Sequence, residues 1–529
     1  MVVGKNSKIT NKSIWQISRE YAGIAEAGGV KNVCCSLAEE LVNHGCKVTH
    51  FIPLYGCTNL KNIKDFDTIP NVCSYFNFYN QKYRVNFAQG YCNGVRIVFI
   101  INTLFTEKNG VYTYTALDEV LNHDHTRGKG HNDAILLDLM FQIAILDYAV
   151  KTSEKVDIIH CQDAATALIP FFARKMRTYK EICSKIKFVM SIHNAGLGYH
   201  HDFSISDALE ATGLPEMEFS LGKINNRVEP FLLSEKYATI TTVSPWYADE
   251  ILNPSNVETG SLSAEFFKRN TKILGITNGI DYEKYNPTNK AVSLLSFAYN
   301  PEKADFLGKI QARKKFVTYY NIKHDNYTTT NPDFVWQYGV LDQYDSKNVY
   351  FSFHGRLVQQ KGIDVLESAA KIVLEKSKNL RFIITGQGDP ELEKQCIELA
   401  NTYNGRFLYL RGYERSVARQ CVAVADFLIL PSYFEPCCLE DFIGQIFGTI
   451  PIAHAAGGLR KIIHGKTGFL YTNNTPETLS KIVLDLASQK QENPATFATI
   501  AQYAAKYVHE NYSWKKIIEK EYIPLYLGL

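Results

Sequence analysis

Short apolar segments alternate with amphipathic helical segments along nearly the whole sequence, and this alternation constrains the fold more than any other feature. It is typical of a parallel β-sheet that is covered by helices on both faces. We therefore predict an α/β protein built from two doubly wound, Rossmann-like halves that face a central cleft. The strands are expected at residues 13–18, 47–53, 95–101, 157–160, 187–192, 240–243, 272–276, 349–353, 381–385 and 427–430.

The length of the chain predicts at least two domains. A chain of 529 residues is too long for one hydrophobic core, and roughly 150 residues per domain allows about two to four domains. The polar stretch at residues 253–263, which is rich in Asn, Ser and Gly, is the best candidate for a boundary. We place the first domain at residues 1–262 and expect residues 327–331 to form an exposed insertion loop.

Composition excludes several classes of function. Hydrophobic residues make up 46% of the chain and charged residues 21%, as in an ordinary folded protein. A net charge of +3 gives no reason to expect nucleic acid or an anionic membrane as a partner. The longest apolar stretch, residues 136–150, is interrupted by Asp138, Gln142 and Asp147. It therefore predicts a core helix and not a membrane span.

The 12 cysteines are expected to be reduced thiols. None of their spacings matches a metal-binding pattern such as Cys-x-x-Cys, and the adjacent pairs Cys34-Cys35 and Cys437-Cys438 do not easily form internal bridges. Lysines and polar residues dominate the first 11 residues, which contain no apolar signal segment. These features predict a cytoplasmic protein with neither a metal ion nor a cofactor.

The segment from residue 425 to residue 447 carries the strongest indication of chemistry. The apolar run at residues 427–430 stops at Pro-Ser and indicates a buried strand, and Glu435-Pro436 precedes a helix expected at about residues 439–447. A carboxylate at the carboxyl end of a parallel strand faces the crevice in which such sheets bind ligands. The first N–H groups of the helix favour an anion such as a diphosphate. The pattern indicates group transfer from a phosphorylated donor; the alternative is that Glu435 only caps the helix.

A second strand end carries positive charge. Residues 349–353 are followed by Arg356 and Lys361, which lie on a strand-to-helix connection of the same kind. A fixed guanidinium group and an ammonium group at such a position neutralise two adjacent phosphates. The alternative is a pair of solvated surface charges, which is the usual explanation for one pair of this kind.

Further motifs accompany these two strand ends in a characteristic order. In the amino-terminal half they are Ala27-Gly28-Gly29-Val30, His160-Cys-Gln-Asp163, Ser191-Ile-His193-Asn194 and Thr241-Thr-Val-Ser-Pro245. In the carboxyl-terminal half they are Gly275-Ile-Thr-Asn278-Gly279-Ile-Asp281, Gly355-Arg356-Leu357 with Gln360-Lys361-Gly362, Thr385-Gly386-Gln-Gly388-Asp389-Pro390, Phe434-Glu435-Pro436-Cys437, and Gly448-Thr-Ile-Pro451 with Gly457-Gly458-Leu459. The chain thereby resembles the glycogen/starch synthase family of retaining glucosyltransferases over nearly its whole length.

The resemblance implies the two-domain, B-type glycosyltransferase fold. Residues 1–262 would form the starch-synthase-like acceptor domain, residues 263–511 the nucleotide-sugar-binding domain, and residues 512–529 a helix that crosses back to the first domain. The implied reaction transfers glucose from a nucleotide sugar to the non-reducing end of an α-1,4-glucan such as glycogen, with retention of configuration. ADP-glucose is favoured as the donor over UDP-glucose.

Family counterparts also imply roles for residues of the nucleotide-sugar-binding domain. Arg356 and Lys361 would neutralise the departing diphosphate in place of a metal ion. Glu435 would orient the sugar and stabilise positive charge at the anomeric carbon. Tyr413 matches an aromatic residue that lies against the nucleotide base. The remaining donor-binding residues are Cys437, Cys438 and Leu439.

In the acceptor domain, the resemblance implies that the backbone of Gly28 and Gly29 approaches the donor diphosphate; the alternative is an ordinary tight turn. Asp163 would hold sugar hydroxyls, and His193 would hydrogen-bond the 6-hydroxyl near the transition state. For each of them the alternative is a capping or structural hydrogen bond. The other histidines of this domain without such support are expected on the surface or in loops: His123, His125, His131, His200 and His201.

Several positions depart from the family pattern. Glu26 stands where the family has a lysine, Asn32 replaces an acid, Cys438 replaces a glycine, and Glu440 and Asp441 begin the helix. A carboxylate that faces a diphosphate repels it, so these departures leave the nucleotide preference open. Two alternatives follow: a glycosyltransferase of the same fold with UDP-glucose or another donor or acceptor, and a catalytically weak glucan-binding protein.

Overall fold

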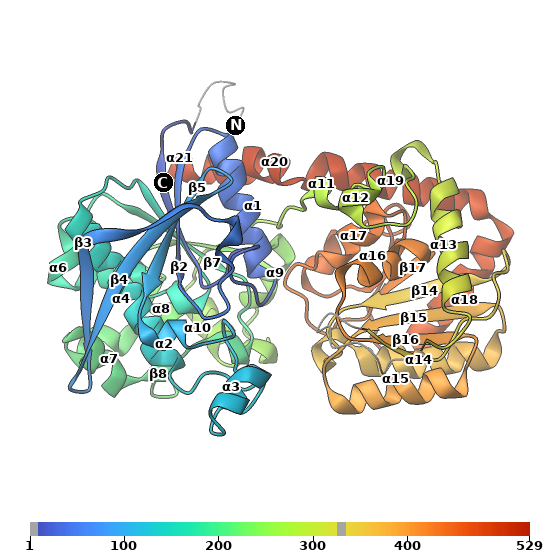
Figure 1. Ribbon diagram of the computed structural model, residues 1–529, viewed down its shortest axis with the longest axis horizontal. Helices are drawn as coiled ribbons and strands as arrows, with labels where there is room; N and C mark the ends of the chain where they lie inside the picture. Colours follow the sequence, from blue (N-terminus) through green and yellow to red (C-terminus); the bar gives the residue numbers. More distant parts are fainter. Residues whose placement is uncertain (1–8, 325–334) are drawn as a thin grey trace. The chain divides into compact units, whose positions relative to one another are not determined.

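Two sheets of mainly parallel strands carry the fold, each in its own unit (Figure 1). The computed structural model describes residues 9–324 and 335–529. The first unit comprises the chain up to Asn278 together with Ile517–Leu529, and the second comprises Gly279–Lys516. The predicted α/β architecture with two Rossmann-like units is confirmed. The insertion loop expected at residues 327–331 lies outside the described residues.

The first sheet has nine strands in the order β12-β11-β7-β6-β1-β2-β5-β4-β3. The strands from β12 to β5 are parallel, and β4 and β3 add antiparallel to one edge. The patterns did not predict β3 and β4, because the first ten residues of β3 and the first four of β4 are exposed or half-buried and form no apolar run. The bounds are β1 (Ser13–Ile17), β2 (Lys47–Pro53), β3 (Lys64–Phe78), β4 (Gln81–Cys92), β5 (Val95–Ile101), β6 (Ile158–Gln162), β7 (Lys187–Ile192), β11 (Thr239–Thr242) and β12 (Ile273–Gly275).

The second sheet has seven strands in the order β13-β16-β15-β14-β17-β18-β19, and within it β13 is antiparallel to its neighbour β16. The patterns predicted β14, β15 and β17 but missed the three-residue strands β13 and β19, as well as β16 and β18. In β18 a proline, Pro451, interrupts the apolar pattern. The bounds are β13 (Trp336–Tyr338), β14 (Val349–His354), β15 (Leu380–Gly386), β16 (Phe407–Arg411), β17 (Phe427–Leu430), β18 (Ile450–His454) and β19 (Phe469–Tyr471).

Helices connect the strands in both units, and a small sheet of β8 (Phe203–Ser204), β9 (Lys223–Ile224) and β10 (Arg227–Val228) belongs to the first. The helices of the first unit are α1 (Val30–Asn43), α2 (Thr103–Thr106), α3 (Ala116–Leu121), α4 (Ala134–Thr152), α5 (Ile169–Lys175), α6 (Arg177–Lys180), α7 (Ile205–Thr212), α8 (Pro230–Ser234), α9 (Pro245–Ile251), α10 (Leu262–Lys268) and α21 (Ile523–Gly528). Those of the second are α11 (Tyr282–Tyr285), α12 (Lys290–Ser293), α13 (Leu307–Tyr319), α14 (Ile363–Lys376), α15 (Pro390–Thr402), α16 (Arg415–Val424), α17 (Glu440–Ile446), α18 (Pro476–Glu492) and α19 (Pro494–Tyr512), and α20 (Trp514–Ile517) joins the two units.

The cores lie between the sheets and these helices. Phe351 and Phe353 of β14 pack on one face of the second sheet with α14, α15, α18 and α19, whereas Tyr350 packs on the other face with α13 and α16. In the first unit, the core helix predicted at residues 136–150 is α4, whose side chains are mostly buried. Across residues 9–324 and 335–529, no helix is long and apolar enough to cross a membrane.

The division between the units falls after Asn278, whereas the sequence placed the domain boundary between residues 262 and 263. Residues 262–278 stay with the first unit because β12 pairs with β11 in the first sheet. The end of the chain also belongs to the first unit, where the Tyr526 hydroxyl lies 2.7 Å from Nδ1 of the buried His160.

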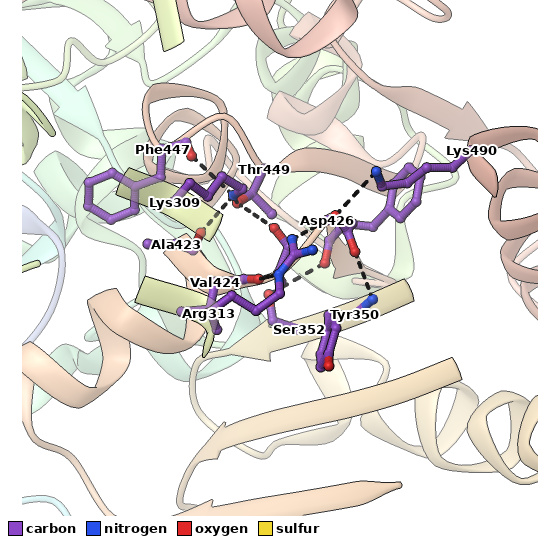
Figure 2. Close-up of polar contacts among 12 residues, drawn as sticks. Lys309, Arg313, Tyr350, Ser352, Ala423, Val424, Asp426, Phe447, Thr449 and Lys490 are labelled. Carbon is purple, nitrogen blue, oxygen red and sulfur yellow. Dashed lines mark hydrogen bonds and ion pairs between the residues drawn. The ribbon is translucent and has the colours of Figure 1, made fainter. Parts of the chain in front are cut away.

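Buried charges stabilise the amino-terminal ends of the strands in the second sheet (Figure 2). Asp426, just before β17, accepts a hydrogen bond from the Tyr350 amide at 2.9 Å through Oδ2. Its Oδ1 lies 2.6 Å from Arg313 Nη2 and 3.4 Å from Lys490 Nζ. This cluster ties α13 and α18 to the end of the sheet opposite the carboxyl ends of the strands, so it serves the fold.

Lys309, one turn before Arg313 on α13, is also buried. Its Nζ donates to the carbonyl oxygens of Ala423 at 2.6 Å and Phe447 at 3.2 Å, and it lies 2.7 Å from Thr449 Oγ1 (Figure 2). These carbonyls belong to the carboxyl ends of α16 and α17, where the last carbonyl groups of a helix have no partner within the helix. Lys309 therefore caps two helices at once.

Candidate active site

The connection after β17 brings Glu435 next to Lys361 in the second unit. Glu435 Oε2 lies 2.5 Å from Lys361 Nζ and accepts a hydrogen bond from Ser432 Oγ at 3.1 Å. The Glu435 side chain is buried. Burial alone would lower the pKa of Lys361, but the Glu435 carboxylate outweighs it and the pKa is raised. The Lys361 ammonium group therefore keeps its positive charge beside Glu435, as a charge-stabilising site requires.

Close packing of two connections creates this proximity. Gly362, which ends the Lys361 turn, has φ +66°, and a Cβ there would lie 1.9 Å from the carbonyl oxygen of Pro431. The Tyr433 amide donates to Gln360 O at 3.0 Å, and Gln360 Nε2 donates to Phe434 O at 3.1 Å. The connections after β14 and β17 are thus joined side by side at the carboxyl ends of their strands.

Arg356 lies on the same connection as Lys361, and its side chain is exposed. Within the described ranges it makes no ion pair with a carboxylate, so it presents an unshared guanidinium group at the carboxyl edge of the sheet. Tyr413 follows β16 and is 56% exposed. Its ring stacks on that of His354, at the end of β14, with a centroid distance of 6.2 Å. His354 was not predicted as a site residue, because one histidine at a strand end carries no distinguishing pattern.

Cys437, Cys438 and Leu439 lie between Glu435 and the first turn of α17. Cys437 and Cys438 are buried, and the helix begins at Glu440, one residue later than predicted. Asp441 does not face solvent, because its Oδ1 pairs with Lys461 Nζ at 2.9 Å in a fully buried position. One of the two acids that depart from the family pattern is thus neutralised inside the protein.

The first unit brings Asp163 and His193 together at the carboxyl ends of β6 and β7. Asp163 Oδ1 accepts hydrogen bonds from the amides of His193 at 2.7 Å and Asn194 at 3.3 Å. Burial raises the pKa of Asp163 to about 7, although both amides oppose it. Asp163 also has φ +61° and ψ 178°, a strained conformation that persists only where surrounding contacts hold it.

His193 is neutral near pH 7, because burial lowers its pKa to about 4. Its Nε2 lies 2.7 Å from Gln162 Oε1, which orients the ring. Because Nε2–H donates to Gln162 Oε1, the uncharged ring has Nδ1 left to accept a hydrogen bond from a hydroxyl. Gln162 is a supporting residue that the sequence did not single out, since its role depends on pairing between β6 and β7.

The loop of Gly28 and Gly29 is anchored by a buried acid, Glu20. Glu20 Oε2 accepts hydrogen bonds from the amides of Ala27 at 3.0 Å and Gly28 at 2.6 Å. The Gly28 amide is therefore occupied by Glu20. A Cβ at Gly29 would meet no atom within 4 Å, so this glycine borders open space at the start of α1. Glu26 pairs with Lys31 at 2.8 Å and accepts from the Gly23 amide at 2.6 Å.

Two of the histidines expected on the surface or in loops lie in loops but are buried. His200 lies 3.0 Å from Glu229 through Nδ1 and 2.8 Å from Ala195 O through Nε2, and His131 is 5% exposed. Glu229 and Ala195 come from other segments and satisfy the buried His200 ring, and sequence spacing does not reveal them. Within residues 9–324 and 335–529, no group of three or more His, Cys, Asp or Glu is placed to hold a metal ion, and all 12 cysteines are free thiols.

Two family models match this chain. One is described as the starch synthase catalytic domain and covers residues 13–264, and the other is described as glycosyl transferases group 1 and covers residues 348–489. A glycogen synthase of Thermodesulfovibrio yellowstonii is 29% identical over 534 residues, which cover 97% of each chain. A glycogen synthase of Flavobacterium johnsoniae is 29% identical over 456 residues, or 85% of each chain.

Solved structures show the same architecture. The catalytic domain of Starch Synthase IV from Arabidopsis thaliana, bound to ADP and acarbose, superposes with a TM-score of 0.80 at 21% identity. The superposition covers 98% of this chain and 99% of that one. This likeness shows that the chain has the two-domain, B-type glycosyltransferase fold.

Proposed function

The chain belongs to the glycogen/starch synthase family, and on this premise we propose that it transfers glucose from ADP-glucose to an α-1,4-glucan with retention of configuration. Glucose would be added to the non-reducing end of the glucan, as in glycogen. Family membership makes the protein a hexosyltransferase that uses a nucleotide sugar. The donor, the acceptor and the residue roles are the parts of the proposal that experiments must test.

The observation that carries the proposal is the juxtaposition of Arg356, Lys361 and Glu435 at the carboxyl edge of the second sheet. When the bond between the anomeric carbon and the diphosphate breaks, the diphosphate keeps the bonding electrons and gains negative charge. The guanidinium and ammonium groups would neutralise that charge, which is a major source of catalysis in such reactions. Glu435 would stabilise the positive charge that develops on the sugar.

Asp163 and His193 would serve the sugar in the first unit. Asp163 retains one carboxylate oxygen beyond the Oδ1 that holds two backbone amides, and that oxygen accepts hydrogen bonds from sugar hydroxyls. The neutral His193 ring would contact the 6-hydroxyl through Nδ1, because the ring N–H is donated to Gln162 Oε1 and the other nitrogen accepts a hydrogen bond from a hydroxyl. Tyr413, which is mostly exposed beside His354, offers a stacking surface for the nucleotide base.

ADP-glucose is the proposed donor because the Starch Synthase IV structure is bound to ADP and the curated relatives are glycogen synthases. Glu26, which departs from the family pattern, is paired with Lys31. Its negative charge is therefore partly compensated and does not by itself exclude ADP-glucose. The alternatives are UDP-glucose, another donor or acceptor, and glucan binding with little catalysis.

The test is release of nucleoside diphosphate from a panel of ADP-, UDP- and GDP-glucose, with and without glycogen. We expect glycogen-dependent release of ADP, and NMR of the product should show α-configured linkages. Lys361→Ala should abolish most of this activity, whereas Lys506→Ala, an exposed lysine of α19, should not. Preference for another nucleotide would redirect the donor assignment, and glycogen binding without release would favour the glucan-binding alternative.

A further inference from the structure

The loop of residues 435–439 contains one residue in a backbone conformation that normally suits glycine. Cys438 has φ +62°, and its side chain is buried. In this left-handed region a Cβ crowds the neighbouring carbonyl group, so residues other than glycine persist there mainly when surrounding contacts hold them. The contacts that hold Cys438 come from Lys461.

Lys461 lies in the turn that follows β18, and its side chain is buried beneath the 435–439 loop. Its Nζ donates to the carbonyl oxygens of Cys437 at 2.5 Å, Cys438 at 3.1 Å and Gly458 at 3.1 Å. The same ammonium group pairs with Asp441 Oδ1 at 2.9 Å. Lys461 thus joins two successive carbonyls of the loop to the first turn of α17.

Asp441 is as buried as its partner, with side-chain exposures of 0% for Asp441 and 1% for Lys461. Its other oxygen lies 3.3 Å from Gln445 Nε2. The desolvation energy lost on burying an ion pair is about as large as the attraction gained between the charges. A protein with an apolar pair of similar size at the same place is therefore often as stable. Stability of the fold alone therefore does not account for these two charges.

Their effect on the loop follows from the planarity of the peptide group. The C=O and N–H of one peptide unit point in opposite directions. Because the carbonyls of Cys437 and Cys438 point at Lys461, the amides of Cys438 and Leu439 point away from it. Neither amide has a hydrogen-bond partner among the residues that the structure describes. Successive amides around a left-handed residue form a concave site for an anion.

A second contact holds the start of the loop. The Gly458 amide donates to the carbonyl oxygen of Glu435 at 2.8 Å. The turn approaches the loop so closely that a Cβ at Gly458 would lie 2.4 Å from the Cα of Cys437. The turn containing Gly458 and Lys461 therefore holds the loop at both ends.

We propose that Lys461 and Asp441 are positioning residues for glucosyl transfer. Their ion pair holds the Cys438 and Leu439 amides, together with the Glu435 carboxylate, in the arrangement that receives the donor diphosphate before the donor arrives. The inference rests on the proposed function, because the diphosphate belongs to the proposed donor. Such preorganisation favours both affinity and rate, since no ordering cost remains when the ligand binds.

The main test is the double variant Lys461→Met/Asp441→Asn. It removes both charges, so no buried charge is left unpaired and the protein should fold. We expect the KM for ADP-glucose to rise about ten-fold. Without the contacts from Lys461, a residue with a Cβ, such as Cys438, disfavours the left-handed conformation by roughly ten-fold relative to other backbone conformations. We also expect kcat to fall.

Substitution of Cys438 in the double variant tests the positioning role directly. If Lys461 and Asp441 only stabilised the fold, this substitution would not change donor affinity. Cys438→Gly should restore most of the donor affinity, because glycine adopts φ +62° without the Cβ penalty. Cys438→Ala also removes the thiol but keeps the Cβ, so it should not restore affinity. Equal rescue by glycine and alanine would overturn the inference.

A matched control is Arg313→Met/Asp426→Asn, which removes a buried ion pair at the opposite end of the strands (Figure 2). It should change thermal stability without changing the KM for the donor. Gly458→Ala offers an independent variant that pushes the turn away from the loop without exposing a buried charge. It should raise the KM as the double variant does, and a parent-like KM in both variants would overturn the inference.

Alkylation of Cys437 and Cys438, mapped by mass spectrometry, reports on the loop without requiring turnover. Both thiols are buried in the parent chain, so we expect faster labelling in the double variant and in Gly458→Ala, and unchanged labelling in the Arg313/Asp426 control. This separates two failures. If the parent does not use ADP-glucose, the proposed function fails while labelling still tests the loop; if labelling does not change, the positioning role is wrong.

Discussion

Replacing Glu435 by glutamine separates the charge of this residue from its shape. Glu435 Oε2 lies 2.5 Å from Lys361 Nζ and accepts a hydrogen bond from Ser432 Oγ. Glutamine has the same size and still accepts from Ser432, but it no longer forms an ion pair with Lys361. The substitution therefore acts on two processes, the binding of the diphosphate and the chemical step.

The two effects have opposite signs. Before the donor binds, Glu435 competes for Lys361, whose side chain is 22% exposed while that of Glu435 is 8% exposed. An ion pair at this intermediate burial is worth about 1 kcal/mol, so its loss should tighten ADP binding about five-fold. In the transition state, loss of a preorganised charge costs about 3 kcal/mol, which lowers kcat by roughly two to three orders of magnitude.

The assay combines isothermal titration with ADP and initial rates at saturating ADP-glucose and glycogen. Ser432→Ala is the control, because it removes a neutral hydrogen bond and keeps the Lys361–Glu435 pair, so both quantities should change little. A Glu435→Gln variant that binds ADP ten-fold more weakly and retains its kcat would refute this reasoning. Glu435 would then be a structural residue of the loop.

Three further predictions follow from the structure. Arg356→Ala should lower turnover about hundred-fold in steady-state assays without changing the melting temperature, because its side chain is exposed; unchanged turnover would remove it from the site. Glu26→Lys replaces the pair with Lys31 by two cations near the Gly28 loop, so titrations should show tighter donor binding that weakens with added salt; weaker binding would mean that Glu26 recognises a ligand. Burial raises the pKa of Glu367 to about 8, despite a hydrogen bond from Cys396, so its stabilising effect is complete below its ordinary value of 4.5 and is lost as the pH rises through 8. Melting temperatures of Glu367→Gln should therefore fall less between pH 5 and pH 8 than those of the parent, and parallel curves would contradict this.

Much of the candidate site could be predicted because its residues stand at the ends of recognisable strands. Residues 349–353 and 427–430 correspond to β14 and β17, and Lys361 and Glu435, which follow them, form an ion pair in the structure. Asp163 and His193 likewise lie together at the ends of β6 and β7. Parallel strands bring their carboxyl ends to one edge, so local patterns suffice to group these side chains.

The supporting residues could not be predicted in this way. Glu20 holds the Gly28 loop, Gln162 orients His193, and His354 stacks on Tyr413. Each of them makes its contact with a side chain or amide from another segment. His200, expected on the surface or in a loop, lies in a loop and is buried against Glu229, which stands 29 residues further along the chain.

The sequence by itself determined the α/β class, the family and the positions of the charged groups at the strand ends, since these depend on local hydrophobic patterns and ordered motifs. Only the tertiary structure decided that Asp441 turns inward to Lys461 and that Cys438 is held at φ +62°. Both outcomes depend on contacts between the connection after β17 and the turn after β18. A buried charge is tolerated only when a partner charge lies beside it, and a strained backbone only when contacts hold it. Tertiary packing provides both kinds of partner.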